Sequence, residues 1–353
     1  PMYLSLAPLA GIFSAGNQVM HKPSEFTPIT SELLKEICDG AFDETEFATF
    51  LGGPDVGAAF TQLKFDHLLF TGSGNIGKHV MRAASENLVP VTLELGGKSP
   101  VIVSDSSNID ITARRVMFNK TLNAGQICLA PDYVYVHETE KDNFVKACKD
   151  QVNEFYSDLK YNPDYTSVIN QKHYDRLKGL LSDAKDHGAE LVEINPANED
   201  FSQQESHKIP PTLVLNPSDE MQIMKEEIFG PLLPIKTYKD INEPINYINK
   251  KDKPLGLYYF GNNKNEEAKV VNSTTSGGVT VNDIMGHIQQ NELGFGGVGP
   301  SGMGKYDGFD GYMNFSNNKP IYKQIGFGLD KLLDAIRPPY KGSIEDVLKK
   351  LLK

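Results

Sequence analysis

Short apolar segments alternate with longer helical patterns along almost the whole chain of 353 residues. We expect strands at residues 18–21, 46–51, 67–71, 89–95, 101–103, 133–137, 255–261 and 278–282. We expect helices at residues 2–16, kinked at Pro8, and at 27–40, 54–63, 77–85, 109–122, 138–155, 171–187 and between the last two strands, with a surface loop at 195–208. Parallel strands need a crossover connection, usually a helix. The alternation therefore predicts an α/β protein with two doubly wound parallel-sheet domains.

Acidic residues outnumber basic ones, with 46 Asp and Glu against 35 Lys and Arg and a formal net charge of −11. This balance argues against a nucleic-acid partner and against an anionic membrane surface. No apolar segment is long enough for stable insertion into a membrane.

The cysteines are odd in number and far apart, at Cys38, Cys128 and Cys148. They do not form a disulfide framework, and they indicate a reducing, cytoplasmic location. No pair of cysteines or histidines has the spacing of metal ligands, so we predict no metal site.

The loop between Phe118 and Pro131 carries one reactive side chain, the thiol of Cys128. Small residues surround this thiol, and Gly125 allows the backbone to come close to whatever binds there. Backbone N–H groups on such a turn favour a thiolate and can hold an oxyanion. The alternative is a small buried cysteine that only packs, and the loop alone leaves both interpretations open.

A glycine pattern, Gly72-x-Gly74-x-x-Gly77, follows a predicted strand and opens a predicted helix. This is the context of a loop that binds the phosphates of a dinucleotide, although a tight strand-to-helix turn gives the same pattern. Upstream, Lys22 and Glu25 follow the strand at 18–21. A glutamate there can accept hydrogen bonds from a ribose diol, but the two residues can also be ordinary solvated charges.

Glu94 ends an apolar strand and precedes two glycines. Ligands of open α/β sheets bind at that end of the strands, where a desolvated carboxylate can act as a general base. The alternative is a buried glutamate paired with Lys98. Glu227 and Phe229 form a further cluster, for which a surface charge and a core aromatic ring are the alternatives.

Nine stretches together resemble the aldehyde dehydrogenase superfamily, most closely its class-3 and coniferyl-aldehyde dehydrogenase-like branch. They are LSLAPLAGIFSAGNQV, KPSE, FTGS, LELGGKSP, NAGQICLAPDY, EEIFGP, LYYF, SGGVTVND and FGGVGPSGMG. They occur in family order from Pro1 to the region of Pro320.

The resemblance implies oxidation of an aldehyde, aromatic or long-chain aliphatic, to the carboxylic acid with NAD, or with NADP, as the cofactor. Cys128 would attack the carbonyl carbon, and Glu94 would activate the water that hydrolyses the thioester. The cofactor would be held by Lys22 and Glu25 at the adenosine ribose, Pro54 and Gly57 near the adenine, Gly72, Ser73 and Gly77 at the pyrophosphate, Leu95 beside them, and Glu227 with Phe229 at the nicotinamide ribose.

The resemblance also implies a domain division: 1–95 as the remainder of the dinucleotide-binding domain, 96–310 as the catalytic domain, and 311–353 as an oligomerisation strand and tail. Residues Gly311 to Gln324 resemble the strand that joins a neighbouring subunit's sheet, which implies a homodimer. Ser343 to Lys353 should form a short amphipathic helix, with Ser343 as its N-cap.

One departure concerns the start of the chain. Family members carry an oxyanion-stabilising Asn just upstream of the segment that matches Pro1, so we expect this chain to begin inside a longer protein, with an incomplete cofactor domain. Loss of one oxyanion donor costs on the order of a hundred- to a thousandfold in rate, so we expect this chain alone to be weakly active or inactive. Two alternatives remain: a relative that passes the acyl group to coenzyme A or phosphate, against which Glu94 argues, and a non-catalytic interaction protein.

Overall fold

The computed structural model describes residues 1–324, 337–338 and 344–352. Contacts divide the chain into a unit of residues 1–316 and a unit of residues 317–353. The described helices are α1 Met2–Leu6, α2 Leu9–Ser14, α3 Pro28–Ala41, α4 Pro54–Phe60, α5 Gly74–Ser85, α6 Ile109–Thr121, α7 Lys141–Phe155, α8 Gln171–Asp186, α9 Gln222–Lys225, α10 Asn242–Lys250, α11 Lys264–Ser273, α12 Gly308–Asn314 and α14 Ile344–Leu351, with 3-10 helices η1 Leu122–Gly125 and η2 Glu138–Glu140. The described strands are β1 Val19–His21, β2 Phe47–Thr49, β3 Leu68–Thr71, β4 Val91–Glu94, β5 Pro100–Val103, β6 Tyr133–His137, β7 Glu190–Glu193, β8 Thr212–Leu215, β9 Leu232–Tyr238, β10 Gly256–Phe260, β11 Gly278–Val281 and β12 Gly302–Met303.

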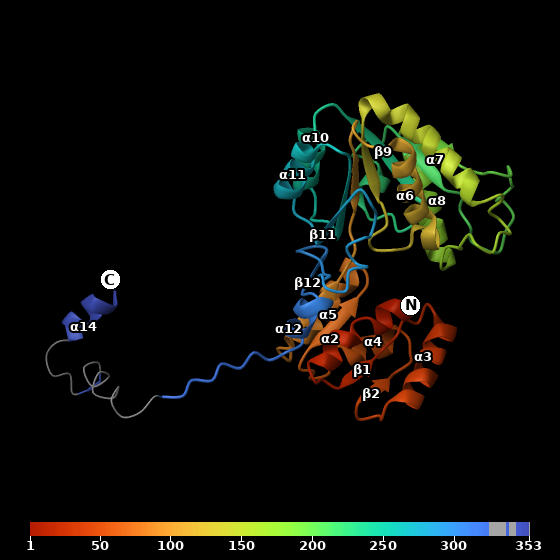
Figure 1. The fold of residues 1–353 in the computed structure, drawn as a ribbon. Helices are drawn as coiled ribbons and strands as arrows, with labels where there is room; N and C mark the ends of the chain where they lie inside the picture. The colour runs from red at the N-terminus through yellow and green to blue at the C-terminus, as the bar shows by residue number, and fades with distance from the viewer. Residues whose placement is uncertain (325–336, 339–343, 353) are drawn as a thin grey trace. The chain divides into compact units, whose positions relative to one another are not determined.

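A seven-stranded sheet forms the larger layer of the first unit, with strand order β11-β10-β5-β6-β9-β8-β7 (Figure 1). All neighbouring strands are parallel except β7 and β8. Successive side chains of a strand face opposite sides: Val101 and Val103 of β5 pack with α6 and α7, whereas Ile102 packs with α8, α10 and α11. Helices cover both faces, which explains why the strands are apolar without alternation.

Two smaller sheets are separate from the seven-stranded sheet. β1 pairs with β2 in parallel, and β3 pairs with β4 in parallel. β12, a distant segment in sequence, adds to β4 as an antiparallel partner, with Gly302 opposite Glu94. α5 packs Val80 and Ala84 against β3 and β4. The end of β4, which carries Glu94, is therefore held between two strands.

The predicted α/β class is confirmed, and the expected strands and helices are present with shifts of a few residues at their ends. The helix at 2–16 is interrupted at Pro8, as expected for a residue without a backbone N–H. The strands β7, β8, β9 and β12 and the helices α9, α10 and α12 were not predicted. The predicted domain boundaries stay a prediction.

One prediction is wrong for part of its range. Residues Gly311 to Asn314 belong to helix α12 rather than to a tail strand, and Gly311 packs closely against the carbonyl of Tyr306. In the second unit, residues 317–324 form no strand within this chain. The expected terminal helix is present as α14, while Ser343 and Lys353 lie outside the described residues. No helix in the described part of the chain is long and apolar enough to cross a membrane.

Candidate active site

A strained loop carries Cys128. Helix α6 ends at Thr121, and Asn123, Ala124 and Gly125 then adopt positive φ angles of 50°, 51° and 71°. A side chain at Gly125 would place its Cβ 2.3 Å from the carbonyl oxygen of Gly230, so only glycine fits both the angle and the space. The sequence predicted that the backbone at Gly125 comes close to another group, and that group is the carbonyl of Gly230 in another segment of this chain. Strain of this kind persists where surrounding structure enforces it, and it collects at functional sites.

Buried hydrogen bonds to backbone carbonyls stabilise the loop that carries Cys128. The ammonium group of Lys120, which is 1% exposed, donates to the carbonyl of Pro131 at 2.7 Å. The amide of Gln126 donates to the carbonyl of Ser167 at 3.0 Å. Cys128 itself is partly buried, and all three cysteines, which lie among the described residues, are unpaired.

The thiol of Cys128 lies within electrostatic reach of two carboxylates. Burial, followed by the charges of Glu227 and Glu94, raises the pKa of the Cys128 thiol to about 12. The backbone N–H groups of Cys128 and Leu129 act in the opposite direction and lower this pKa. The expectation that these N–H groups favour the thiolate is right in direction, but burial and two negative neighbours outweigh them.

Glu94 is a buried carboxyl group without a partner. Its side chain is 3% exposed, and neither carboxylate oxygen has a hydrogen-bond partner in the described part of the chain. Burial, with a smaller contribution from Asp307, raises the pKa of Glu94 to about 9. The alternative of a pair with Lys98 is wrong, because Lys98 forms a short ion pair with Asp132.

Glu227 and Phe229 lie in a turn after α9. The Glu227 carboxylate touches the backbone at Gly96, because a Cβ built there would lie 2.2 Å from one of its oxygens. Burial, followed by the charge of Asp132, raises the pKa of Glu227 to about 7. Phe229 is partly buried and has a φ of 45°. Neither residue is therefore a plain surface charge or a fully buried core ring.

Arg176 fixes this turn from the side of α8. Its guanidinium donates to the carbonyls of Glu227 at 3.2 Å and Ile228 at 2.6 Å. The turn that carries Glu227 and Phe229 is therefore anchored through its backbone.

Lys22, Glu25 and Gly57 lie close together. Lys22 forms an ion pair with Glu25 at 2.7 Å, and a Cβ at Gly57 would lie 3.8 Å from the Lys22 side chain. The hydrogen bond from Lys22 lowers the pKa of Glu25. Pro54 is the first residue of α4, the helix that contains Gly57.

The turn from β3 into α5 leaves the first residue of the helix open, and one of its glycines bonds to the neighbouring strand. The hydroxyl of Ser73 accepts a hydrogen bond from the N–H of Ile76 and caps the helix, and next to it Gly74 has no heavy atom within 4 Å of an added Cβ. The N–H of Gly72 donates to the carbonyl of Glu94 at 3.0 Å. A helix N-terminus that is open at its first turn fits a phosphate group.

Gly77 and Leu95 contact each other instead. A Cβ at Gly77 would lie 2.7 Å from a methyl carbon of Leu95, which is 7% exposed. Close helix-to-strand packing is the usual role of the third glycine in such a turn. The contact gives both residues a packing role, and their predicted contact with a cofactor stays a prediction.

The model of the aldehyde dehydrogenase family matches residues 1–321 of this sequence. The chain belongs to the aldehyde dehydrogenase family. A probable coniferyl aldehyde dehydrogenase of Caulobacter vibrioides is 55% identical over 348 residues, which cover 99% of this chain and 72% of that protein. This similarity, and that to family 3 members, confirms the predicted branch.

Solved structures of the family have the same fold. The substrate-bound AldH of Staphylococcus aureus has a TM-score of 0.86 at 40% identity, covering 100% of this chain and 75% of that one. A betaine aldehyde dehydrogenase of Staphylococcus aureus in complex with NAD+ has a TM-score of 0.78 at 26% identity, covering 87% and 61%. The chain is an oxidoreductase that oxidises aldehydes to carboxylic acids with NAD(P).

Sequence reasoning missed a buried clamp in this aldehyde dehydrogenase. Lys98 donates to Asp132 and to the carbonyls of Ile223 at 2.7 Å and Glu226 at 2.9 Å, and Asp132 accepts from the N–H of Ile228 at 2.9 Å. The clamp joins three of the resembling stretches, those that carry Glu94, Cys128 and Glu227. Its residues are far apart in sequence, so no local pattern could pair them.

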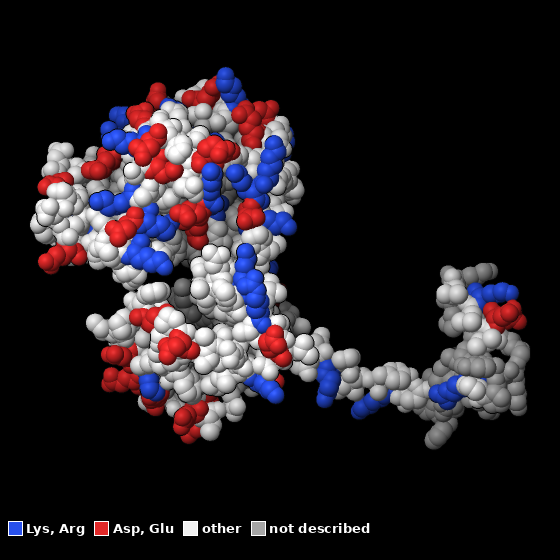
Figure 2. All heavy atoms as spheres, turned by 180° about the vertical axis from the view of Figure 1, so that it is seen from behind, with Lys and Arg blue, Asp and Glu red and all other residues white. Residues whose placement is uncertain are grey.

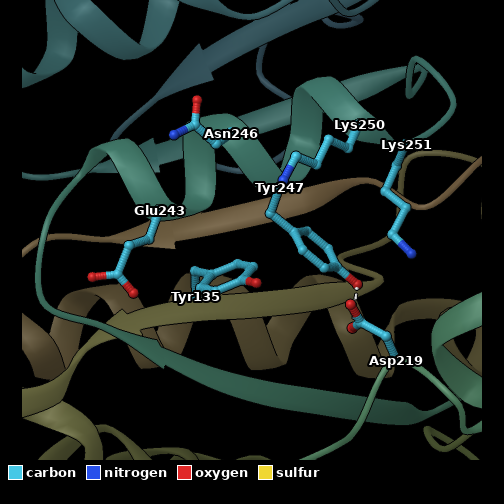
Figure 3. A pocket seen from close by; sticks show the side chains of 7 residues that line it. All are labelled: Tyr135, Asp219, Glu243, Asn246, Tyr247, Lys250 and Lys251. Carbon is cyan, nitrogen blue, oxygen red and sulfur yellow. Dashed lines mark hydrogen bonds between the residues drawn. The ribbon is translucent and has the colours of Figure 1, made fainter.

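Two surface pockets, of about 450 and 580 Å³, are lined by neither Cys128 nor Glu94. In the smaller, Tyr135 and Tyr247 from β6 and α10 lie side by side, and the Tyr247 hydroxyl donates to Asp219 at 2.8 Å (Figure 3). Lys236 also bonds Asp219, at 2.8 Å. The hydrogen-bonding groups of this pocket therefore bond to one another.

Acidic and basic side chains are interspersed on the face that Figure 2 shows.

Proposed function

We propose that Cys128 is the nucleophile of this aldehyde dehydrogenase and that Glu94 is its general base. The observation that carries the proposal is their proximity across the site: Glu94 acts electrostatically on the Cys128 thiol, and its two buried oxygens have no partner among the described residues. A buried acceptor without a partner is rare in folded proteins and calls for an explanation. A water molecule activated for attack supplies one.

The chemistry follows from what an aldehyde lacks, namely a leaving group. Attack by the Cys128 thiolate forms a carbon–sulfur bond and places a negative charge on the aldehyde oxygen. The backbone N–H groups of Cys128 and Leu129, which face the sulfur, are positioned to stabilise this charge. When bound, the oxidised nicotinamide accepts the hydride. Glu94 then takes a proton from water, whose oxygen attacks the thioester, and the acid and the free thiol are released.

We also propose how the cofactor is held. Glu25, fixed by Lys22, supports the adenosine ribose near Gly57 and Pro54, and Glu227 supports the nicotinamide ribose beside Phe229. The open start of α5 at Gly72 and Ser73 takes the pyrophosphate, with Gly77 and Leu95 packed beneath it. The carboxylate of Glu25 disfavours a 2′-phosphate, so NAD is preferred and NADP is accepted less well.

For the substrate, we propose aromatic or long-chain aliphatic aldehydes. The relatives are named for coniferyl aldehyde and for 4,4′-diaponeurosporen-aldehyde. On this chain, Phe118 and Leu122 expose apolar side chains, 53% and 43% exposed, at the end of α6 just before the nucleophile loop. These side chains offer an apolar approach to Cys128.

A cytoplasmic homodimer completes the proposal. Three unpaired cysteines suit a reducing compartment. Residues 317–324 carry the exposed side chains of Ile321 and Tyr322, 75% and 81% exposed, on a segment without strand partners among the described residues. An exposed segment of this kind suits addition to a second subunit's sheet. Light scattering at micromolar concentration tests the dimer.

The proposed roles are tested by stopped-flow measurement of NADH formation and acid release with an aromatic aldehyde. Cys128→Ala should abolish both. Glu94→Gln should retain one rapid turnover of NADH and slow the later turnovers, roughly a hundred- to ten-thousandfold, because it removes only the base. Wild-type turnover of Cys128→Ala, or of Glu94→Gln, contradicts the assignment. Acyl transfer to coenzyme A faster than hydrolysis would favour the acylating alternative.

A further inference from the structure

A turn of four residues, 127–130, presents the thiol of Cys128. The N–H of Ala130 closes the turn by donating to the carbonyl of Ile127 at 2.9 Å. The N–H groups of Cys128 and Leu129 lie inside the turn and face the sulfur, and neither donates to an oxygen acceptor in the described part of the chain. These are the two groups proposed above to stabilise the oxyanion, so the contacts that hold the turn also determine where they point.

One buried phenol holds this turn. The hydroxyl of Tyr258 in β10 donates to the carbonyl of Leu129 at 2.7 Å, and the Tyr258 side chain is fully buried. No other described side chain forms a hydrogen bond with the backbone of residues 127–130. The bond from Tyr258 therefore joins the turn to the seven-stranded sheet.

The strand makes room for the phenol at Gly256. Gly256 and Tyr258 are two residues apart in β10 and face the same side of the sheet. A Cβ at Gly256 would lie 2.7 Å from the Tyr258 hydroxyl oxygen and 2.9 Å from a methyl carbon of Leu129. The Tyr258 ring also packs against the imidazole ring of His287, with 6.4 Å between the centroids. The hydroxyl is therefore confined between the strand and the turn.

The hydrogen bonds of the turn form one chain with a single direction. The carbonyl of Leu129, which accepts from Tyr258, belongs to the same peptide group as the N–H of Ala130. The carbonyl of Ile127, which accepts from Ala130, belongs to the same peptide group as the N–H of Cys128. Hydrogen bonds linked in this way polarise one another, by roughly 10–30% per bond. The chain begins at the Tyr258 hydroxyl and ends at the Cys128 N–H, which becomes a stronger donor.

We propose that Tyr258 is a positioning residue of the oxyanion site: its hydroxyl fixes the turn and polarises the N–H of Cys128 toward the substrate oxygen. The proposal rests on the proposed role of Cys128 as the nucleophile. Attack on the aldehyde and hydrolysis of the thioester each place a negative charge on this oxygen. Loss of the Tyr258 hydroxyl should slow both steps, whereas a reaction of the thiol that forms no oxyanion should keep its rate.

The alternative is that the hydroxyl only satisfies a buried carbonyl, as most buried polar groups do. Tyr238 of β9 offers a matched case, because its side chain is 2% exposed and its hydroxyl donates to the carbonyl of Val103 at 3.3 Å. Its ring packs in the cluster on the other face of the seven-stranded sheet. Tyr238→Phe is therefore the control that removes a buried phenol hydroxyl without touching the turn at Cys128.

The experiment compares two reactions of Cys128 at one pH, in the chain without cofactor. p-Nitrophenyl acetate acylates the thiol through a tetrahedral oxyanion, and the burst of p-nitrophenolate reports the rate. Iodoacetamide alkylates the thiol by displacement, without an oxyanion. Both reactions need the thiolate, so the ratio of their rate constants does not depend on the fraction of thiolate. Cys128→Ala gives the background of both reactions.

In Tyr258→Phe, the ratio of acylation to alkylation should fall roughly five- to thirtyfold, less than the hundred- to thousandfold cost of removing an oxyanion donor outright. The fall should lie in the limiting burst rate, with the ester concentration for half-maximal rate unchanged, because the phenol bonds to the turn and not to the ester. Tyr238→Phe should keep the wild-type ratio. A wild-type ratio in Tyr258→Phe, or an equal fall in Tyr238→Phe, overturns the proposal.

Two further outcomes are decisive. If Tyr258→Phe does not fold, as judged by circular dichroism, Gly256→Ala replaces it, because the added methyl group displaces the phenol hydroxyl. A reduced ratio in Gly256→Ala then supports the proposal, and a wild-type ratio overturns it. If the unchanged chain shows no burst that depends on Cys128, the proposed function itself fails, and the role of Tyr258 fails with it.

Discussion

Burial and neighbouring acidic side chains, Glu227 and Glu94 for the thiol of Cys128 and Asp307 for the carboxyl group of Glu94, keep both groups protonated near neutral pH. The pKa of the thiol is about 12 and that of the carboxyl group about 9, whereas a nucleophile and a base must both lose a proton. The resting site is therefore unreactive. Bound positive charge would activate it, because it favours the ionised forms of the thiol and the carboxyl group.

The first prediction concerns labelling of Cys128 in the chain without cofactor. The rate constant for iodoacetamide should rise roughly tenfold per pH unit from about pH 7 to about pH 10, because only the thiolate reacts. Glu227→Gln should label faster at each pH, since Glu227 is the first of the two charges that raise the pKa of this thiol. Cys128→Ala is the control for Cys38 and Cys148, which are buried. A plateau below pH 9 contradicts the prediction.

The second prediction concerns the stability cost of Glu94. Its pKa rises from 4.5 to about 9 on folding. Below the lower value both states are protonated; as pH rises to the upper value, the unfolded state loses a proton that the folded state keeps, so stability falls. Glu94→Gln removes this loss, on the order of a few kcal/mol near pH 8.

Melting temperatures of Glu94→Gln and wild type at several pH values check this. The difference should grow from pH 5 to pH 9 in favour of the variant. Glu205→Gln, at an exposed position, is the matched control and should show no such trend. A constant difference across this range would show that Glu94 titrates alike in both states.

At the scale of elements, the loop that carries Cys128 depends on Gly125. Gly125→Ala must relieve a φ of 71° and a contact of 2.3 Å with the carbonyl of Gly230. We expect a loss of roughly 2–4 kcal/mol in the free energy of unfolding and displacement of Cys128. The control is Gly179→Ala in α8, which meets no atom within 4 Å and should be neutral or stabilising by roughly 0.5–1 kcal/mol.

Urea unfolding and the iodoacetamide rate together measure this prediction. If Gly125→Ala unfolds at the wild-type urea concentration, the loop is more pliable than its contacts indicate, and the strain argument at Asn123 and Ala124 fails with it.

The central strands that were predicted share one property. Strands β5 and β6 are apolar runs between turn residues, because they are buried on both faces. β12 has two residues in a glycine-rich stretch and is defined only by its register against β4, so no periodicity marks it. Residues 311–314 were expected as a strand, but close packing of Gly311 on Tyr306 favours helix α12.

The residues of the candidate site also fall into two groups: those whose setting follows from local sequence, and those whose contacts only the structure shows. Glu94 was predicted because it ends an apolar strand, and Cys128 because it lies in a loop of small residues, so local sequence gives the setting of each. The partners of Asp132 are set by tertiary contacts over long separations, as in the bond from Lys98 to Asp132. Sequence showed that Glu94 is desolvated, but only the structure shows that it lacks a partner.

At the scale of the whole molecule, the clamp between Lys98 and Asp132 joins the segment after β4 to the seven-stranded sheet and to α9. The Asp132 side chain is 3% exposed and that of Lys98 17%. Removal of one partner from a buried pair leaves an uncompensated charge and costs roughly 3–5 kcal/mol, more than removal of both. Asp132→Asn should therefore destabilise the chain more than the double variant Lys98→Met, Asp132→Asn.

The same clamp ties stability to chemistry, because it holds the three stretches that carry Glu94, Cys128 and Glu227. Below the urea transition, folded Asp132→Asn should label Cys128 at an altered rate, whereas Lys35→Met, which removes an exposed pair with Asp39, should change neither stability nor labelling. A double-mutant cycle from urea unfolding gives the coupling energy of the pair. Additive effects would show that Lys98 and Asp132 act separately, and that other contacts bring the reactive groups together.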